Sequence, residues 1–100
     1  MEPGRFAEPG VLILTSLAEG PKHGYALIKD IERFAGVTLG PGTLYGALAR
    51  LEKRGLIRPL EAEDRRHPYE LTAPGAVELG HRLADMRVVA DVGLRRLALS

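Results

Sequence analysis

Apolar residues recur at helical spacing in successive stretches of the chain, which Gly and Pro separate from one another. Pro9 suits the first turn of a helix, and Gly20 followed by Pro21 ends it. A second helix is expected over 23–35, with Gly36 as its C-terminal stop. The apolar side chains expected to face inward from these two helices are Val11, Leu12, Leu14, Leu17, Leu27, Ile28, Ile31, Phe34 and Ala35.

A third helix is expected to begin at Pro41 and to end before Gly55. Its inward stripe is apolar and consists of Leu44, Ala47, Leu48 and Leu51. Its outward face carries small residues, hydroxyl groups and cations, with no acid before Glu52, and consists of Gly42, Thr43, Tyr45, Gly46, Ala49, Arg50 and Lys53. Because small side chains leave room and cations attract phosphate, this face can lie close to a nucleic-acid backbone.

After Gly55 the hydrophobic period shortens to two, which predicts strands over 56–60 and 68–72 and a polar hairpin tip over 61–67. Pro59 cannot donate to a ladder, so its strand should lie at an edge. A two-stranded hairpin is marginal by itself in water, and we expect it to lean on the helices. Thr72 is placed to cap a last helix with its hydroxyl group.

The last helix carries apolar residues at alternating spacings of three and four, as a coiled-coil seam does, with weak points at Ala90 and Gly93. A helix of about 25 residues is roughly 37 Å long, which is more than three short helices can cover. The uncovered part needs a partner, and the simplest partner is a second copy of the chain. The expected dimer interface consists of Ala76, Leu79, Leu83, Met86, Ala90, Leu94 and Leu97.

Composition supports one compact unit, because the chain has 100 residues, of which 45% are hydrophobic and 27% charged. The net charge is only +1, but residues 41–68 hold six basic and four acidic residues, so a positive excess lies in the middle of the chain. The absence of Cys excludes disulfides and thiolate chemistry. The longest apolar run, 11–14, is too short to cross a membrane, and the acidic start lacks a basic leader, so we expect a cytoplasmic protein.

The order of the expected elements is that of a winged helix-turn-helix. The fold class is mainly α (α+β), with three N-terminal helices, a two-stranded β wing and a long C-terminal dimerisation helix. We divide the chain into a DNA-binding part over 1–72 and a dimerisation helix over 73–100, within one compact unit. In this fold the third helix enters the major groove of DNA, with Arg50 and Lys53 as its cations. The residues of the hairpin tip that can reach phosphates or a narrow minor groove are Arg65, Arg66 and His67.

The run LGPGTLYGALARLEKRGLI, residues 39–57, closely resembles the recognition-helix signature of PadR-like transcriptional regulators. Further matches over about residues 9–80 are His23-Gly24-Tyr25 at the second helix, and Arg65-Arg66, Pro68-Tyr69, Leu71-Thr72 and Gly75 around the wing. The resemblance implies a homodimeric regulator without enzymatic activity that binds double-stranded DNA, usually as a repressor. We therefore predict an inverted-repeat operator, read by two helices in successive major grooves.

The resemblance also implies roles for individual residues. It places Tyr25 near the DNA backbone and Arg65 and Arg66 in the wing, and it turns toward DNA the residues Thr43, Tyr45, Arg50 and Lys53. Family members are often released from DNA by a small molecule, whereas no cofactor is implied. The last helix resembles the family's short dimerisation element. Candidate effector contacts on the first and last helices are Phe6, Leu12, Met86 and Val89.

Other functions remain open from the residues alone. Tyr45 can pack against the preceding turn instead of DNA, and the wing cations can pair with Glu63 and Asp64. Three scattered histidines make a poor metal site. An enzyme would have to use His67, Asp64 and Tyr69 on an exposed hairpin, where we expect no flanking pocket. The main alternative is a winged-helix module that binds protein through its leucine seam without specific DNA binding.

Overall fold

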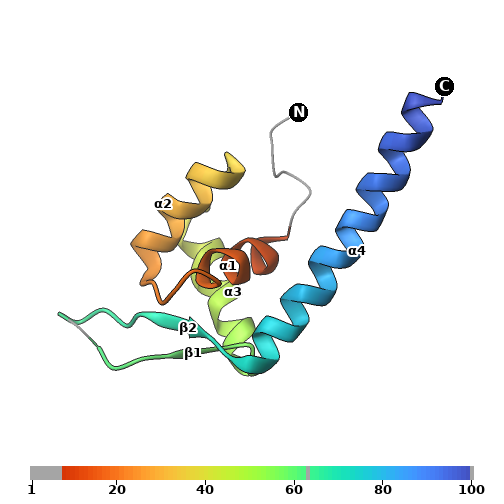
Figure 1. Ribbon diagram of the computed structural model, residues 1–100. Coiled ribbons are helices and arrows are strands. Elements are labelled where there is room, and N and C mark those ends of the chain that lie inside the picture. Colours follow the sequence, from red (N-terminus) through yellow and green to blue (C-terminus); the bar gives the residue numbers. More distant parts are fainter. Residues whose placement is uncertain (1–7, 63, 100) are drawn as a thin grey trace.

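The computed structural model describes residues 8–62 and 64–99, which form four helices and one two-stranded antiparallel sheet (Figure 1). This arrangement confirms the predicted winged helix-turn-helix class. In chain order the elements are α1 (Pro9–Leu17), α2 (Gly24–Ala35), α3 (Pro41–Lys53), β1 (Ile57–Pro59), β2 (Tyr69–Leu71) and α4 (Ala73–Ala98).

Local chemistry fixes most ends of the helices where the sequence predicted them, although α1 ends at Leu17, before the predicted stop at Gly20. α1 and α3 each have Pro in the first turn, where no backbone N–H is needed. Gly36 follows α2 with φ 69°, and Gly55 follows α3 with φ 76°, a left-handed conformation that glycine adopts without strain. The Thr72 hydroxyl accepts a hydrogen bond from the Gly75 N–H at 3.0 Å and so caps α4.

The hydrophobic core lies between α1, α2 and α3. α1 is buried on almost every side, and the inward stripe of α3 is buried as predicted. The prediction for Phe34 was wrong, because 47% of this residue is exposed. It lies at the margin of the inward face of α2, next to buried Ala35. Helical spacing identifies the centre of such a face but not how far the core extends over it.

The wing is attached to the helical part of the chain through backbone hydrogen bonds on the outer edge of β2. Within the sheet, Pro59 pairs with Tyr69 in antiparallel register. The N–H and the C=O of Tyr69 both bond to the backbone of Lys22, at 2.9 and 3.1 Å, and this forms an isolated bridge to the α1–α2 turn. The backbone N–H and C=O of Tyr69 point toward Lys22 and therefore away from Pro59. Pro59 lies at the outer edge of the sheet, where its missing N–H costs no hydrogen bond.

α4 begins against the core and then leaves it (Figure 1). Gly75 and Leu79 are buried, whereas from Leu83 onward every described residue except Val92 is exposed. The prediction that Leu79 faces a partner needs correction, because it is only 6% exposed and packs in the core of its own chain. Leu12, a predicted effector contact, is likewise buried in that core at 5% exposure, because α1 is covered by the other helices.

Candidate nucleic-acid interface

The outward face of α3 is exposed to solvent. Gly42, Thr43, Tyr45, Arg50 and Lys53 are exposed, and Gly46 is half-buried. Among the described residues none covers the Gly42 Cα, because a Cβ built there meets no atom within 4 Å. The first turn of this face is therefore open to a large partner.

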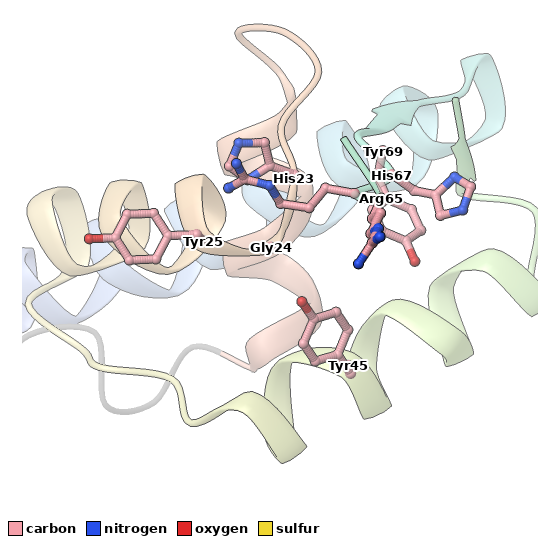
Figure 2. Close-up of a pocket in the computed structure, with 8 residues that line it drawn as sticks. His23, Gly24, Tyr25, Tyr45, Arg65, His67 and Tyr69 are labelled. Atoms are coloured by element: carbon pink, nitrogen blue, oxygen red, sulfur yellow. The ribbon is translucent and has the colours of Figure 1, made fainter. Parts of the chain in front are cut away.

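A depression of about 240 Å³ lies beside this face, between α2, α3 and the wing (Figure 2). Five residues that the sequence predicted as DNA contacts line it together, namely Tyr25, Tyr45, Arg65, Arg66 and His67. It is also lined by His23, Gly24 and Tyr69. The expectation that no pocket flanks the hairpin was therefore wrong, because the wing folds toward α2 and α3 and encloses space between them. We call this feature the wing depression.

Tyr45 contributes to the wing depression from α3. Figure 2 shows its hydroxyl directed toward the start of α2. A Cβ added at Gly24 would lie 2.6 Å from that oxygen, so the absence of a side chain at this position lets the ring approach. Tyr45 thus lies against the start of α2, a contact that the sequence analysis did not predict, and it stays 56% exposed and able to meet a partner.

The start of α2 presents backbone donors to the wing depression. His23 is the N-cap residue, and in the described part of the chain no side chain caps this end. The first intrahelical acceptor is the His23 carbonyl, which bonds to the Leu27 N–H, so the N–H groups of the first turn have no helical partner. Free N–H groups and the positive end of the helix dipole favour an anion.

His23 and Tyr69 belong to this site although the sequence did not assign them to it. The His23 Nδ1 atom is buried and has no hydrogen-bond partner among the described residues. Burial, followed by the charge of Glu52 and the neighbouring Tyr45, raises the pKa of the Tyr69 hydroxyl above its usual value of 10.0. Tyr69 therefore stays neutral and can donate a hydrogen bond. Both residues lie in the matching motifs His23-Gly24-Tyr25 and Pro68-Tyr69, which are the signals that could have found them.

The hairpin tip holds one of its cations, Arg65, in an unusual backbone conformation. Asp64 and Arg65 have φ values of 48° and 68°, in the left-handed region that non-glycine residues rarely adopt. Arg65, Arg66 and His67 are exposed. Among the described residues neither arginine forms an ion pair with Asp64, and Glu63 lies outside the described residues. The tip therefore presents its arginines to solvent.

Arg50 lies on the other flank of α3. It lines a second depression of about 280 Å³, which is formed with the start of α1, Arg54 and Arg82. The predicted contacts on α3 thus divide between two flanks, and Arg50 is not part of the wing depression.

The predicted dimer contacts lie on α4, and so do two of the predicted effector contacts, Met86 and Val89. Apart from Leu79, the dimer contacts are exposed, and they consist of Ala76, Leu83, Met86, Ala90, Leu94 and Leu97. Val89, a predicted effector contact, is 73% exposed. Phe6 lies outside the described residues. Within residues 8–62 and 64–99, no group of three or more His, Asp or Glu side chains could hold a metal ion, and no helix has the length and hydrophobicity needed to cross a membrane.

Comparison with known proteins identifies the family. Residues 13–81 match the transcriptional regulator PadR-like family. The chain belongs to the PadR-like family. This membership confirms the resemblance read from the sequence. PadR-like proteins are transcriptional regulators and not enzymes, which agrees with the predicted absence of catalytic activity.

Individual relatives of this PadR-like chain differ in length. The chain is 55% identical over 71 residues to an uncharacterised 37.1 kDa protein in transposon Tn4556 of Streptomyces fradiae. The match covers 71% of this chain but only 21% of that protein, so the chain spans about a fifth of this relative.

Solved structures of similar length share the fold. A transcriptional regulator from Clostridium thermocellum is 30% identical, with a TM-score of 0.75 and 84% of each chain covered. A PadR family transcription regulator from Clostridium difficile is 26% identical, with a TM-score of 0.81, and the match covers 91% of this chain and 99% of that one.

Proposed function

We propose that this PadR-like chain is a sequence-specific DNA-binding transcriptional repressor that acts as a homodimer on an inverted-repeat operator in the cytoplasm. In this proposal α3 is the recognition helix and enters the major groove. The wing depression receives the sugar-phosphate backbone beside that groove. Residues 1–72 provide the DNA-binding part, and 73–100 the dimerisation helix.

The observation that carries the proposal is the joining of an open, acid-poor helix face to the wing depression. Two arginines of the wing and the uncapped start of α2 surround the same space. Cations and free N–H groups that converge from separate elements fit a phosphate group. The Tyr45 hydroxyl lines the same space, and so does the Tyr69 hydroxyl, whose pKa is raised by burial. Both can donate to phosphate oxygens there.

The backbone of the wing tip supports the same role. A left-handed conformation at a non-glycine residue costs roughly 1–3 kcal/mol, and Gly would adopt it at Arg65 without strain. Arg65 is charged at a position where Gly would be unstrained, which favours a function for the Arg65 side chain. Contact with DNA is the function that fits its exposed position beside the wing depression.

Selection of bound fragments from random DNA, followed by salt titration, tests the proposal. We expect one enriched sequence with two-fold symmetry and an affinity that falls steeply with salt, with a log–log slope of about −0.9 for each neutralised phosphate. Arg66→Ala should reduce the magnitude of that slope by about 1 if the side chain contacts a phosphate. The control is Arg33→Ala, since Arg33 is 75% exposed and lies at the far end of α2.

The exposed apolar side chains of α4 favour a second candidate function, which is a module that binds another protein through this helix. A flat salt response and no enriched sequence would support this candidate and contradict DNA binding. A small-molecule effector is a further part of the proposal. Met86 and Val89 remain as its candidate contacts, and a ligand that binds there should raise the melting temperature in a thermal-shift screen.

A further inference from the structure

Hydrogen bonds from Thr72 hold the start of α4 close to the residues that follow α3. The Thr72 N–H donates to the Leu56 carbonyl at 3.1 Å, and the Thr72 hydroxyl donates to the Gly55 carbonyl at 2.7 Å. The same hydroxyl accepts from the Gly75 N–H. Thr72 therefore ties the first turn of α4 to the two residues that follow the C-cap of α3.

Gly75 makes this junction closer than any other residue would allow. It is buried, and a Cβ built on it would overlap the carbonyl oxygen of Leu56 and lie 2.9 Å from the Leu71 Cδ1 atom. The atom in the way is backbone, so no rotamer change can relieve the overlap. Backbone must therefore shift to make room, and we expect α4 to move relative to the end of α3.

A chain of ion pairs braces the junction from the outside. Glu78 of α4 lies 3.5 Å from Arg54, the C-cap residue of α3, and 3.2 Å from Arg82. Arg82 in turn lies 3.0 Å from Glu8, the N-cap residue of α1. The side chains of Glu78 and Arg82 are about one-third exposed, at 31% and 34%. The chain joins α3, α4 and α1, so a rotation of α4 would break it.

We propose that this junction, formed by Thr72, Gly75 and Glu78, sets the angle between the recognition helix and α4 and thereby specifies the spacing of the two operator half-sites. The inference rests on the proposed homodimeric DNA binding. If two copies pair through α4, the position of each recognition helix follows from the angle at its junction. These residues act on specificity by positioning α3 and need not touch DNA.

The length of α4 amplifies any change at the junction. Its 26 residues span about 39 Å at 1.5 Å per residue. A tilt of about 10° would move the far end of such a helix by roughly 7 Å, which is about two base pairs at 3.4 Å each. Half-sites on DNA come at discrete spacings and rotational phases, so a displacement of this size changes which operator fits.

The first experiment measures the angle without DNA. The chain has no Cys, so spin labels can be placed on Cys substituted for Ala49 of α3 and Asp85 of α4, both exposed. Labelled chains are diluted with unlabelled chains so that distances within one chain dominate. We expect one narrow distance distribution in the otherwise unmodified protein, a shifted mean in Gly75→Ala and a broadened distribution in Glu78→Ala. The control Gly80→Ala should match the unmodified protein, because a Cβ at Gly80 meets no atom within 4 Å.

The second experiment measures spacing preference with duplexes that carry the selected half-sites at varied separations. We expect the unmodified chain to prefer one spacing by about tenfold, a free-energy difference of about 1.4 kcal/mol. Gly75→Ala should move the optimum by one or more base pairs, and Glu78→Ala should flatten the preference. Affinity for a single half-site should stay within about twofold, since neither residue lies on the α3 face.

The outcomes separate the two proposals. Unchanged distance distributions and an unchanged spacing optimum in folded Glu78→Ala protein would overturn the role of the junction, even if Gly75→Ala does not fold. Binding of single half-sites with no spacing preference in the unmodified protein would overturn the spacing inference and leave DNA binding intact. If the unmodified protein binds no duplex, the proposed function and the inferred preference for one half-site spacing are both overturned. The spin-label distances would still show whether the junction fixes the angle of α4.

Discussion

A substitution at Gly46 tests separately how α3 contributes to stability and how it contributes to the proposed DNA binding. A glycine inside a helix lowers stability by about 0.5–1 kcal/mol relative to alanine. A Cβ at Gly46 would meet only the tip of the Arg50 side chain, at 3.5 Å, which can move. We therefore expect Gly46→Ala to raise the free energy of unfolding by this amount, as measured by urea titration.

The same substitution should weaken DNA binding, because the added methyl group stands between the helix backbone and the base edges. The matched control is Gly80→Ala, which should gain similar stability and keep the affinity of the unmodified chain. Equal affinities of Gly46→Ala and the unmodified chain in a gel-shift titration would show that this face of α3 does not lie close to DNA.

The Tyr69 hydroxyl makes the stability of the wing depend on alkaline pH. Its folded-state pKa is raised, first by burial and then by Glu52 and Tyr45. Well below pH 10 the hydroxyl is neutral in both states. As the pH rises above 10, the unfolded chain loses this proton before the folded chain does, so stability falls. Tyr69→Phe should remove this part of the decline, as measured by urea midpoints between pH 8 and 11. Tyr25→Phe, at a site 62% exposed, should retain the decline.

At the scale of elements, Lys22 attaches the wing to the helices. Its backbone pairs with Tyr69, and its Nζ atom bonds to the Ser16 carbonyl and lies 2.8 Å from Glu19 and 3.8 Å from Asp30. The side chains of Lys22 and Asp30 are only 13% and 14% exposed. Lys22→Met would leave the Ser16 carbonyl without this donor and Asp30 without one of its partners, so we expect a loss of about 1–3 kcal/mol in urea titration.

Lys29→Met is the matched control for this substitution. Lys29 is on the same helix as Asp30 but is 49% exposed, and its ion pair with Glu32 spans 3.9 Å. Exposed pairs of this kind contribute about 0–1 kcal/mol. If both variants lose equally little stability, the buried side-chain network of Lys22 does not stabilise the fold.

The elements themselves could be predicted from the sequence, because their ends depend on neighbouring residues. Gly36, Gly55 and Thr72 each end or begin an element through a local backbone or hydroxyl preference. Contacts between elements could not be predicted in this way. The approach of Tyr45 to Gly24 and the bridge between Lys22 and Tyr69 depend on how separate segments meet in space.

The candidate site shows the same division. The exposed cations and small residues of α3 follow from a period of 3.6, which also placed Leu79 in the seam of α4. That period cannot distinguish a side chain that packs on its own core from one that meets a partner, and Leu79 packs on its own core. Likewise, the wing depression arises only when the hairpin attaches to the α1–α2 turn beside the start of α2, so His23 was not assigned to it from the sequence.

At the scale of the whole molecule, the shape is elongated, with extents of 55 × 27 × 20 Å, because α4 projects beyond the core. Large apolar side chains on the projecting part are exposed, among them Met86 at 46%, Leu94 at 67% and Leu97 at 73%. A stable monomer rarely exposes a continuous apolar stripe of this kind. The stripe lies on the same side of α4 as buried Leu79 and extends outward from it. A second copy of the chain that packs along this side could cover the exposed part of the seam.

Leu83→Asp tests whether this stripe pairs two chains. Leu83 is 40% exposed, and it lies on the seam one turn beyond buried Leu79. A carboxylate there would be desolvated without a partner on pairing, so we expect monomers in light scattering at micromolar concentration. Operator affinity should fall by about 10²-fold or more, because two half-sites would no longer be held together.

Val88→Asp is the control. Val88 is 61% exposed and lies about 140° around the helix from Leu83, so its charge would stay in solvent and the dimer should persist. If Val88→Asp gives monomers and Leu83→Asp gives dimers, the chains pair through the opposite face of α4. If the unmodified chain is itself monomeric at this concentration, the exposed leucines serve another partner.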